Sequence, residues 1–279
     1  MIINGLEFTF GADPEFFVQK EGRPVSAYGL IPGDKKNPHQ VGWGAVQVDG
    51  MALEFNINPA KGEAGFIRNL NEVMRTILNM VPEYQMYDLP VADFGFDYIQ
   101  GQPEEAKELG CEPDFNAYTM DINPRPNADA PFRTASGHIH IGWTKDVDPH
   151  DAGHFEACAT LSKMLDVFLG IPSLIWDEDD RRRELYGKAG SFRPKSYGME
   201  YRTLSNRWLR PDKPFISKFV FNNAVGAVKK CFDNPDYAME NFMGKTAREI
   251  IDTGDRKAAM SFLKYQAPYK KPIEYKDAA

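Results

Sequence analysis

The first sixty residues of the chain alternate apolar and polar positions in short runs. Turn signals separate these runs, among them Asn4-Gly5, the stretch "PGDKKNP" at 32–38 and Asp49-Gly50. Alternation with a period of two, interrupted by such turns, is typical of antiparallel strands joined by hairpins. The N-terminal part of the chain is therefore predicted to form a hairpin-rich sheet.

Apolar residues recur at steps of three and four between Gly62 and Val81. This period predicts an amphipathic helix that buries one stripe of side chains. The same pattern predicts a second long helix from Pro149 to Leu169. Further helical segments are predicted at Pro214–Phe232 and at Tyr237–Tyr265, so helices are expected mainly in the second half of the chain.

Short strands are predicted between and after these helices, at Ala92–Tyr98, Phe115–Ile122, Ser136–Trp143 and Met199–Leu204. Strands joined by hairpins and followed by helices are typical of α+β proteins built on an antiparallel sheet. No low-complexity linker interrupts the sequence. We therefore expect one α+β domain over residues 1–268, followed by a C-terminal tail over residues 269–279.

The composition of the chain excludes some classes of partner and indicates the cellular compartment. The net charge of −7 argues against a polyanion such as duplex DNA as a partner. The chain has no apolar run of about eighteen residues and no secretion signal, so we expect a cytoplasmic protein that does not enter a membrane. Cys111, Cys158 and Cys231 lie far apart, a spacing that indicates neither a disulfide framework nor a cysteine-bound zinc.

Two acids flank a proline in "GADPEF", residues 11–16. Side chains two apart on a strand share a face, so Asp13 and Glu15 project from one side and Phe16 from the other. Pro14 cannot donate to a strand ladder, which predicts an edge, a bulge or a strand start at this position. The two acids are candidates for a functional site, and the alternative is an edge strand kept soluble by charge.

The predicted strand "SGHIHIGW", residues 136–143, places His138 and His140 on one face and Ile139 and Ile141 on the other. Paired histidines occur in many kinds of metal site, whereas a lone buried histidine is usually a hydrogen-bonded part of the core. His138 and His140 are therefore candidate metal ligands.

The stretch "VQVDGMALEFNINPA", residues 46–60, shows the same arrangement. It presents Glu54, Asn56 and Asn58 on one strand face, with Asp49 at the preceding turn. The opposite face of this strand is apolar. Glu54 thus joins the acids that can project from one side of the sheet.

In "MEYRTL", residues 199–204, Glu200 and Arg202 share a strand face, and in isolation they would be an ordinary ion pair.

Together, the four strands would place carboxylates and imidazoles on one face of the sheet. The charged side chains on this face would repel one another unless cations bind there. Carboxylates with histidine and without cysteine suit Mg²⁺ or Mn²⁺, and Mg²⁺ commonly bridges carboxylates to substrate phosphates. The sequence therefore predicts a divalent-metal site.

The segment 181–210 is strongly basic, with nine Lys or Arg residues against two Glu residues. Its glycines allow the backbone to approach a ligand, and guanidinium groups bind phosphate oxygens in pairs. A nucleotide triphosphate site is therefore predicted, although the chain has no GxxxxGK[ST] loop and no GxGxxG after a strand. For Arg181–Arg183 the favoured interpretation is a solvated basic helix. The predicted nucleotide-binding residues are Ser191, Arg193, Lys195, Arg202 and Arg207.

Five stretches, in this order, make the chain similar to a known family: "GADPEF", "VDGMALEFN", "GCEPDFNAYT", "SGHIHIG" and "GSFRPKSYGMEYRTLSNRW". From about Gly11 to Leu209 the chain resembles the phage-type carboxylate-amine ligases, a branch of the glutamine synthetase and glutamate-cysteine ligase superfamily. The resemblance implies a glutamine synthetase-like catalytic domain. Such a domain is a curved antiparallel sheet whose concave face binds ATP and metals, with helices packed outside.

The resemblance also implies roles for single residues. The implied metal ligands are Asp13, Glu15, Glu54, one or both of His138 and His140, and Glu200. Asp13 is shorter than the Glu that is usual at its position, so Glu15 is the firmer assignment. The implied catalytic residues are Glu200, Arg202, Arg207 and Asp114, with Arg202 facing the transferred phosphoryl group.

The second acid frame, "GCEPDF" at 110–115, belongs to the resemblance with the phage branch alone. We assign it to substrate recognition through Asp114, Asn116 and Tyr118. Asp114 or one of the two histidines could also accept the proton of the amine. The alternative is a turn that leads into a strand.

The implied reaction is the ATP-dependent joining of a carboxylate to an amine. The carboxylate attacks the γ-phosphate to give an acyl phosphate and ADP, and the amine then displaces phosphate. Metal ions and arginine would stabilise the phosphoryl transition state. The acid is a small molecule or a peptide, and the sequence indicates no oligomeric state. The compartment would be the host cytoplasm if a phage encodes the chain.

Other functions would use the same residues differently. A guanidino kinase of related fold would release a phosphorylated product instead of an amide and free phosphate. A non-enzymatic acidic metal-binding or virion protein would show no dependence on nucleotide. A metal hydrolase that uses His138 and His140 is less favoured, because it would leave the basic segment at 181–210 without a purpose.

Overall fold

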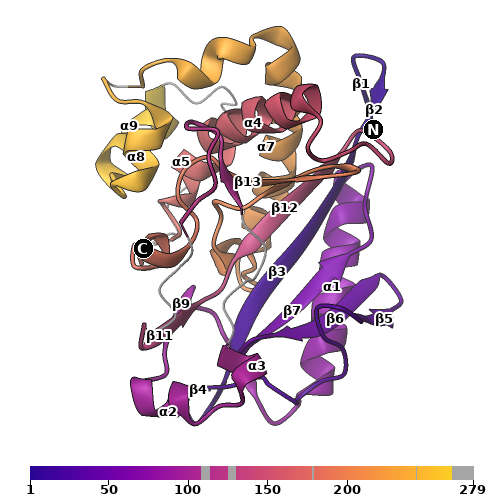
Figure 1. The fold of residues 1–279 in the computed structure, drawn as a ribbon, viewed down its shortest axis with the longest axis vertical. Coiled ribbons are helices and arrows are strands. Elements are labelled where there is room, and N and C mark those ends of the chain that lie inside the picture. Colours follow the sequence, from indigo (N-terminus) through magenta and orange to yellow (C-terminus); the bar gives the residue numbers. More distant parts are fainter. Residues whose placement is uncertain (108–113, 125–129, 178, 243, 266–279) are drawn as a thin grey trace.

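The computed structural model describes residues 1–107, 114–124, 130–177, 179–242 and 244–265 (Figure 1). The predicted tail at 269–279 and residues 110–113 of the second acid frame lie outside this part of the chain. Most strands join one antiparallel sheet in the order β10-β13-β14-β12-β3-β7-β6-β5, and β4 and β8 also pair with β3. Helices and an antiparallel sheet thus share one chain, as an α+β class requires.

The strands of this sheet are β3 (Thr9–Lys20), β4 (Arg23–Val25), β5 (His39–Val41), β6 (Gly44–Asp49), β7 (Ala52–Ile57), β8 (Gln85–Tyr87), β10 (Phe115–Asn116), β12 (Gly137–Gly142), β13 (Ser191–Lys195) and β14 (Gly198–Tyr201). Two small pairs lie apart from it, β1 (Ile2–Ile3) with β2 (Leu6–Glu7) and β9 (Val91–Asp93) with β11 (Phe132–Thr134). The α-helices are α1 (Glu63–Met80), α2 (Phe96–Gln100), α3 (Glu104–Lys107), α4 (Ala152–Leu165), α5 (Ile171–Ser173), α6 (Arg182–Leu185), α7 (Pro214–Asp233), α8 (Ala247–Asp252) and α9 (Arg256–Tyr265). A π-helical turn at Asp166–Gly170 joins α4 to α5, and 3₁₀ turns lie at Asn206–Trp208 and Pro235–Met239.

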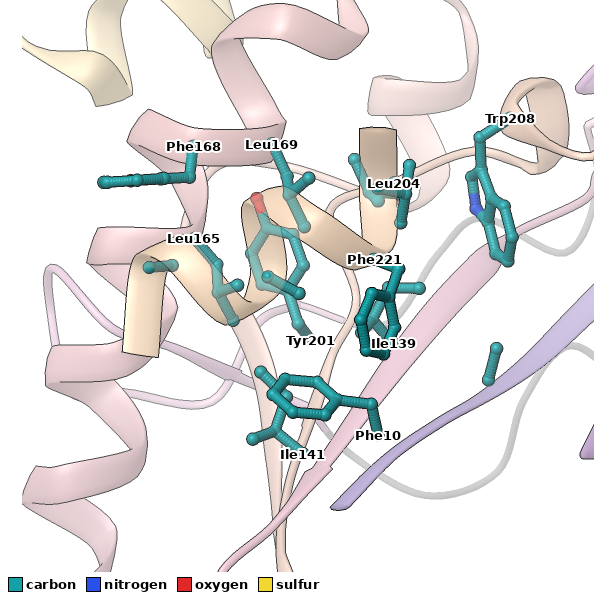
Figure 2. Close-up of a cluster of buried hydrophobic side chains, with 14 of the residues drawn as sticks. Phe10, Ile139, Ile141, Leu165, Phe168, Leu169, Tyr201, Leu204, Trp208 and Phe221 are labelled. Atoms are coloured by element: carbon teal, nitrogen blue, oxygen red, sulfur yellow. The ribbon is translucent and has the colours of Figure 1, made fainter. Parts of the chain in front are cut away.

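Helices cover the apolar face of the sheet. Helix α1 packs on β6 and β7, whereas α4 packs on β13 and β14, and α7 contacts both helices. Figure 2 shows the strand residues Phe10, Ile139 and Ile141 among Leu165 of α4 and Phe221 of α7. Because neighbouring strand positions point to opposite faces, this packing directs Asp13, His138 and His140 away from the helices.

Several predicted elements are confirmed with small shifts. The helix predicted from Gly62 to Val81 is α1, and the strand predicted at Ser136–Trp143 is β12. The helix predicted at Pro214–Phe232 is α7. The predicted second long helix is present, but it continues through the π-helical turn into α5. Hydrophobic periodicity therefore located the main helices and the central strands.

Three predictions are wrong in part. The strand predicted at Ala92–Tyr98 ends at Asp93, and α2 begins at Phe96. The strand predicted at Phe115–Ile122 stops at Asn116, because the Asn116 side chain accepts the Tyr118 amide and the chain turns. The helical segment predicted at Tyr237–Tyr265 is interrupted, with the 3₁₀ turn at Pro235–Met239, α8 and α9 as separate elements. Gly244 and Gly254, with φ of +82° and +61°, lie between these segments.

Of the three alternatives predicted at Pro14, an edge, a bulge or a strand start, the edge is wrong, because β3 lies inside the sheet between β12 and β7. The Glu15 amide donates to Ser136 on the β12 side, which directs the nitrogen of Pro14 toward the β7 side. Pairing between β3 and β7 begins only at Glu15, opposite Glu54. The proline therefore lies where this pairing starts, and no ladder hydrogen bond is lost.

No helix in the described residues is long and apolar enough to cross a membrane. The longest, α7, carries polar and charged residues along its length.

Asp166 forms a buried polar network at the π-helical turn. Its carboxylate accepts hydrogen bonds from the hydroxyls of Tyr201 (2.7 Å), Tyr118 (2.9 Å) and Thr203 (3.3 Å). The side chain is fully buried, and burial raises the pKa of Asp166 to about 7. The network links the β10 turn and β14 to the helical layer.

We predict that Asp166 makes the stability of the protein fall as the pH rises from about 4 to about 7. The pKa of Asp166 is about 7 in the folded protein and about 3.9 in an unfolded chain. The protonated side chain therefore stabilises the folded state by at most about 4 kcal/mol at low pH, and this contribution is lost as the pH rises to about 7. Asp166→Asn should remove this contribution. Urea unfolding of both proteins at pH 5 and pH 7.5 measures it, and an equal pH dependence in the two would contradict the prediction.

Candidate metal and phosphate site

Two groups of potential metal ligands lie on the polar face of the sheet. Asp13, His140 and Glu200 form the first group, which we call the histidine site. Glu15, Asp49 and Glu54 form the second, the carboxylate triad. Within each group, one ligand atom from each residue lies within 4.8 Å of the others. Strand β3 contributes one acid to each group.

Strand register assembles the histidine site. On β12, His138 is opposite Asp13 of β3, and His140 is opposite Glu200 of β14. Nε2 of His140 lies 3.0 Å from Oδ1 of Asp13, and Nδ1 of His140 is hydrogen-bonded to the Tyr197 hydroxyl. Three adjacent antiparallel strands therefore bring together residues that are far apart in the sequence.

The potential ligand atoms of the histidine site are suited to binding a metal ion. Oδ1 of Asp13 and Nε2 of His140 are buried, and neither makes a hydrogen bond of good geometry with any described residue. Buried polar atoms normally have such partners, so this pair is suited to a shared ligand. A metal-binding histidine usually has its other nitrogen fixed by a hydrogen bond, as Tyr197 does for His140.

His138 occupies a different position. Its Nδ1 lies 3.2 Å from Oε1 of Glu200, 3.3 Å from Oδ1 of Asp13 and 3.4 Å from Nη1 of Arg202. Burial and the nearby Arg202 charge lower the pKa of His138. The pKa of His140 is instead raised, because the Asp13 carboxylate outweighs the effect of burial. The geometry therefore favours His140 as the ligand and His138 as the residue that connects the acids.

Each carboxylate of the triad is oriented by one donor. The Ser136 amide donates to Oε2 of Glu15 at 2.8 Å, and Nε2 of Gln47 donates to Oε2 of Glu54 at 2.7 Å. Lys35 contacts Asp49. Burial, together with the Asp49 charge, raises the pKa of Glu15 to about 8 and the pKa of Glu54 well above its usual range. Such crowding of acids indicates a place for a cation.

Asp49 was not among the predicted ligands. The sequence signal was present, since Asp49 ends β6 immediately before the Gly50 turn and β7 then returns Glu54 to its side. The contact depends on how this hairpin folds against β3. Strand alternation alone therefore did not reveal it.

Three basic side chains contact Glu200 of β14. Its side chain is 1% exposed and contacts Nη1 of Arg202, with Nη1 of Arg193 and Nζ of Lys195 each at 3.3 Å. Nε of Arg202 also lies 3.4 Å from Oδ2 of Asp114. Burial opposes ionisation, but these cations hold the pKa of Glu200 well below its usual range. Three cations thus lie directly beside the histidine site.

Other predicted residues lie elsewhere. The guanidinium of Arg207 donates to Asp88 and to the Trp176 carbonyl. Ser191 is 1% exposed, and its hydroxyl accepts from Asn123. The side chain of Asn116 donates to the Ala189 carbonyl, and the Tyr118 hydroxyl donates to Asp166. These contacts fix loops and the core, whereas Asp114, within the described part of the second acid frame, reaches Arg202.

The expectation of a solvated helix at Arg181–Arg183 is wrong for two of the three arginines. Arg182 is 1% exposed and donates to the carbonyls of Thr203 and Leu204 and to the Ser136 hydroxyl. Arg183 is 8% exposed. Arg182 thus binds the carbonyls of the segment that follows β14, of which the Leu204 carbonyl also accepts the Gly137 amide of β12.

A solvent-open pocket lies beside the triad. Its lining includes Glu15, Asp49, Arg202 and Tyr186. The hydroxyl of Tyr186 is buried and has no hydrogen-bond partner among the described residues. Apolar side chains such as Met51 form another part of the wall. The pocket therefore joins the acids and Arg202 to a mixed surface that can hold a small substrate.

The two histidines should differ in their effect on metal binding. His140→Asn removes a direct ligand, so we expect Mn²⁺ binding at the histidine site to weaken at least tenfold, whereas His138→Asn should have a smaller effect. Titration with Mn²⁺ followed by electron paramagnetic resonance, in the presence of a non-hydrolysable ATP analogue, compares them. The opposite order would show that His138 is the ligand.

Comparison with known proteins agrees with the motifs. The model of the family described as phage phiEco32-like COOH.NH2 ligase-type 2 matches residues 131–263. No curated protein matches the chain. The matched segment contains β12, β13 and β14, whereas both acids of β3 precede it. Over residues 131–263, the comparison thus confirms the resemblance to the phage-type carboxylate-amine ligases.

Proposed function

We propose that the chain is an ATP-dependent carboxylate-amine ligase that forms an amide through an acyl phosphate. The family match supports the ligase class. The observation that carries the proposal is the pair of ligand groups on one sheet face, next to Arg193, Lys195 and Arg202. Acidic groups for two metal ions beside a cluster of cations are what the binding of a metal-nucleotide complex requires.

The proposed fold is that of a glutamine synthetase-like catalytic domain. Its support is the antiparallel sheet with one face covered by α1, α4 and α7 and the other lined with acids and histidines. In such an arrangement the helices hold the strands in register. The strands in turn fix the spacing of the ligands across the polar face.

The two ligand groups have different proposed roles. The triad, with three carboxylates beside Lys35, would hold a divalent ion by itself. At the histidine site, three cations already contact Glu200, so a metal ion there would bind together with the phosphates of ATP. Bound Mg²⁺ or Mn²⁺ would supply charge neutralisation for the phosphate oxygens.

Arg202 is proposed to hold the transferred phosphoryl group. It contacts Glu200, lies 3.4 Å from Asp114 and lines the pocket beside the triad. Its guanidinium can therefore present a planar pair of donors to phosphate oxygens. Arg193 and Lys195 would add charge on the other side of Glu200.

The pocket beside the triad is proposed to hold the acid, a small molecule or a peptide terminus. The carboxylate of this substrate would attack the γ-phosphorus, and ADP would leave. The amine would then attack the acyl carbon, phosphate would leave, and the amine would lose a proton. Asp114, whose side chain is 14% exposed, is the proposed acceptor of this proton. Tyr186 would donate to the acid.

The reaction can be tested without knowing the amine. Hydroxylamine intercepts an acyl phosphate, so Mg-ATP, hydroxylamine and a mixture of amino acids, dicarboxylic acids and peptides should yield a hydroxamate together with equal amounts of ADP and phosphate. Arg202→Lys should lower this rate by about 100-fold or more, since a preorganised bidentate donor is lost. The surface variant Arg181→Lys, whose partners are Asp93 and Asp179, is the matched control.

Each contrary result points to another function. Transfer of phosphate to a guanidino compound, with no hydroxamate, would favour a kinase of related fold. Nucleotide-independent metal binding with no turnover would favour the non-enzymatic metal-binding protein. Equal rates for Arg202→Lys and the wild-type chain would contradict the role of Arg202.

A further inference from the structure

Asp49 is the triad member that is held by a charged partner. Nζ of Lys35 lies 2.7 Å from Oδ1 of Asp49. Glu15 and Glu54 are instead held by neutral donors, the Ser136 amide and the Gln47 side chain. Asp49 also differs in its setting, because it is the last residue of β6 and pairs with Ala52 at the end of the hairpin, next to the Gly50 turn. The orientation of Asp49 therefore depends more on its partner than that of the other two acids.

The backbone that carries Lys35 is fixed to the strand that carries Asp49. Gly33 has a φ of +94°, and a Cβ there would lie 2.5 Å from the Val46 carbonyl oxygen, so the loop fits against β6 only with glycine. The Val48 amide donates to the Gly33 carbonyl at 3.2 Å. Lys35 thus enters the site from a backbone position that β6 itself determines.

A turn directly after Gly33 stiffens the loop further. Oδ1 of Asp34 accepts the amides of Lys36 at 2.8 Å and Asn37 at 2.9 Å. This is the side-chain-to-backbone pattern of an Asx turn, which holds the two residues around Lys35 in a defined conformation. Lys36, the next residue, is exposed and has the same charge.

The charges around the triad also agree with a fixed lysine. With all three carboxylates ionised, as metal ligands are, they and one ammonium group sum to −2, which one divalent cation neutralises. Of the three carboxylates, Asp49 interacts most strongly with the ammonium, followed by Glu54 and Glu15. Arg202 is a further cation near Glu15 and lines the pocket. Lys35 therefore need not leave when a divalent ion enters.

We propose that Lys35 is a positioning residue of the metal site, a fixed outer partner that orients Asp49 as the third ligand of the triad. The proposal rests on the proposed function, because it requires the triad to bind a divalent cation. Outer partners of metal ligands commonly change metal affinity by 10- to 100-fold. Lys35 differs from most of them because it carries the same sign of charge as the ion.

This charge makes the effect of a substitution diagnostic. Removing a nearby positive charge would by itself tighten the binding of a cation. Loss of the partner that orients Asp49 would instead weaken the binding of the cation. If Lys35→Met binds Mn²⁺ about tenfold more weakly than the wild-type chain, the change cannot be an electrostatic effect of the missing charge, and it reports lost orientation. Lys36→Met gives the charge effect alone, and Lys35→Arg should retain most of the affinity.

The experiment combines Mn²⁺ titration of the full chain, read by electron paramagnetic resonance, with the reactivity of the two lysines. Brief acetylation followed by mass spectrometry compares Lys35 with Lys36 in the same peptide, with and without Mg²⁺. We expect Lys35 to react more slowly than Lys36, and to be protected equally or better when Mg²⁺ is bound.

Other outcomes overturn the proposal. Equal or tighter Mn²⁺ binding by Lys35→Met, or faster acetylation of Lys35 with Mg²⁺, would show that Lys35 competes with the metal and is displaced by it. Either result leaves the proposed function intact. Absence of Mn²⁺ binding by the wild-type chain, with or without nucleotide, would instead overturn the proposed function and this proposal with it.

Discussion

The alternation of side chains along β3 is the constraint on which the site depends. Phe10 and Phe16 point into the core, and Asp13 and Glu15 therefore point to the opposite face. Asp13 meets β12 and the histidine site, whereas Glu15 meets β7 and the triad. A shift of one residue in the register of β3 would bury both acids among apolar side chains and remove one ligand from each group.

The two ligand groups on this face differ in the charges around them, and this difference suits two different ions. The triad is rich in negative charge, and burial raises the pKa of Glu15 and Glu54. Around Glu200, basic side chains have the opposite effect and keep its pKa low. Arg182 connects the two regions, since it holds both the Ser136 hydroxyl and the backbone that follows β14. The Ser136 amide in turn orients Glu15.

Much of this arrangement follows from local sequence patterns. Period-two alternation was enough to place Asp13, Glu15, Glu54, His138, His140, Glu200 and Arg202 on polar strand faces. It could not choose between His138 and His140, because both lie on the same face and the difference comes from Tyr197, which joins the site through a distant turn. Asp49 is the last residue of β6 and its partner Lys35 lies in a loop, where strand periodicity gives no orientation. The position of Arg207 depends on Asp88, a contact between segments far apart in sequence. The burial of Arg182 likewise depends on the carbonyls after β14, which only the folded chain brings to its guanidinium.

The central claim is that the polar face of the sheet binds a metal-nucleotide complex. The most direct test compares the thermal midpoint of the protein alone, with Mg²⁺, with a non-hydrolysable ATP analogue, and with both, in the wild-type chain, Glu15→Gln and the exposed control Glu83→Gln. Binding at a hundredfold excess over Kd stabilises the folded state by about 2.7 kcal/mol, a readily measured shift. The account predicts a shift with the analogue only when Mg²⁺ is present, lost in Glu15→Gln and kept in Glu83→Gln. No shift at millimolar nucleotide, or a shift that survives Glu15→Gln, would contradict it.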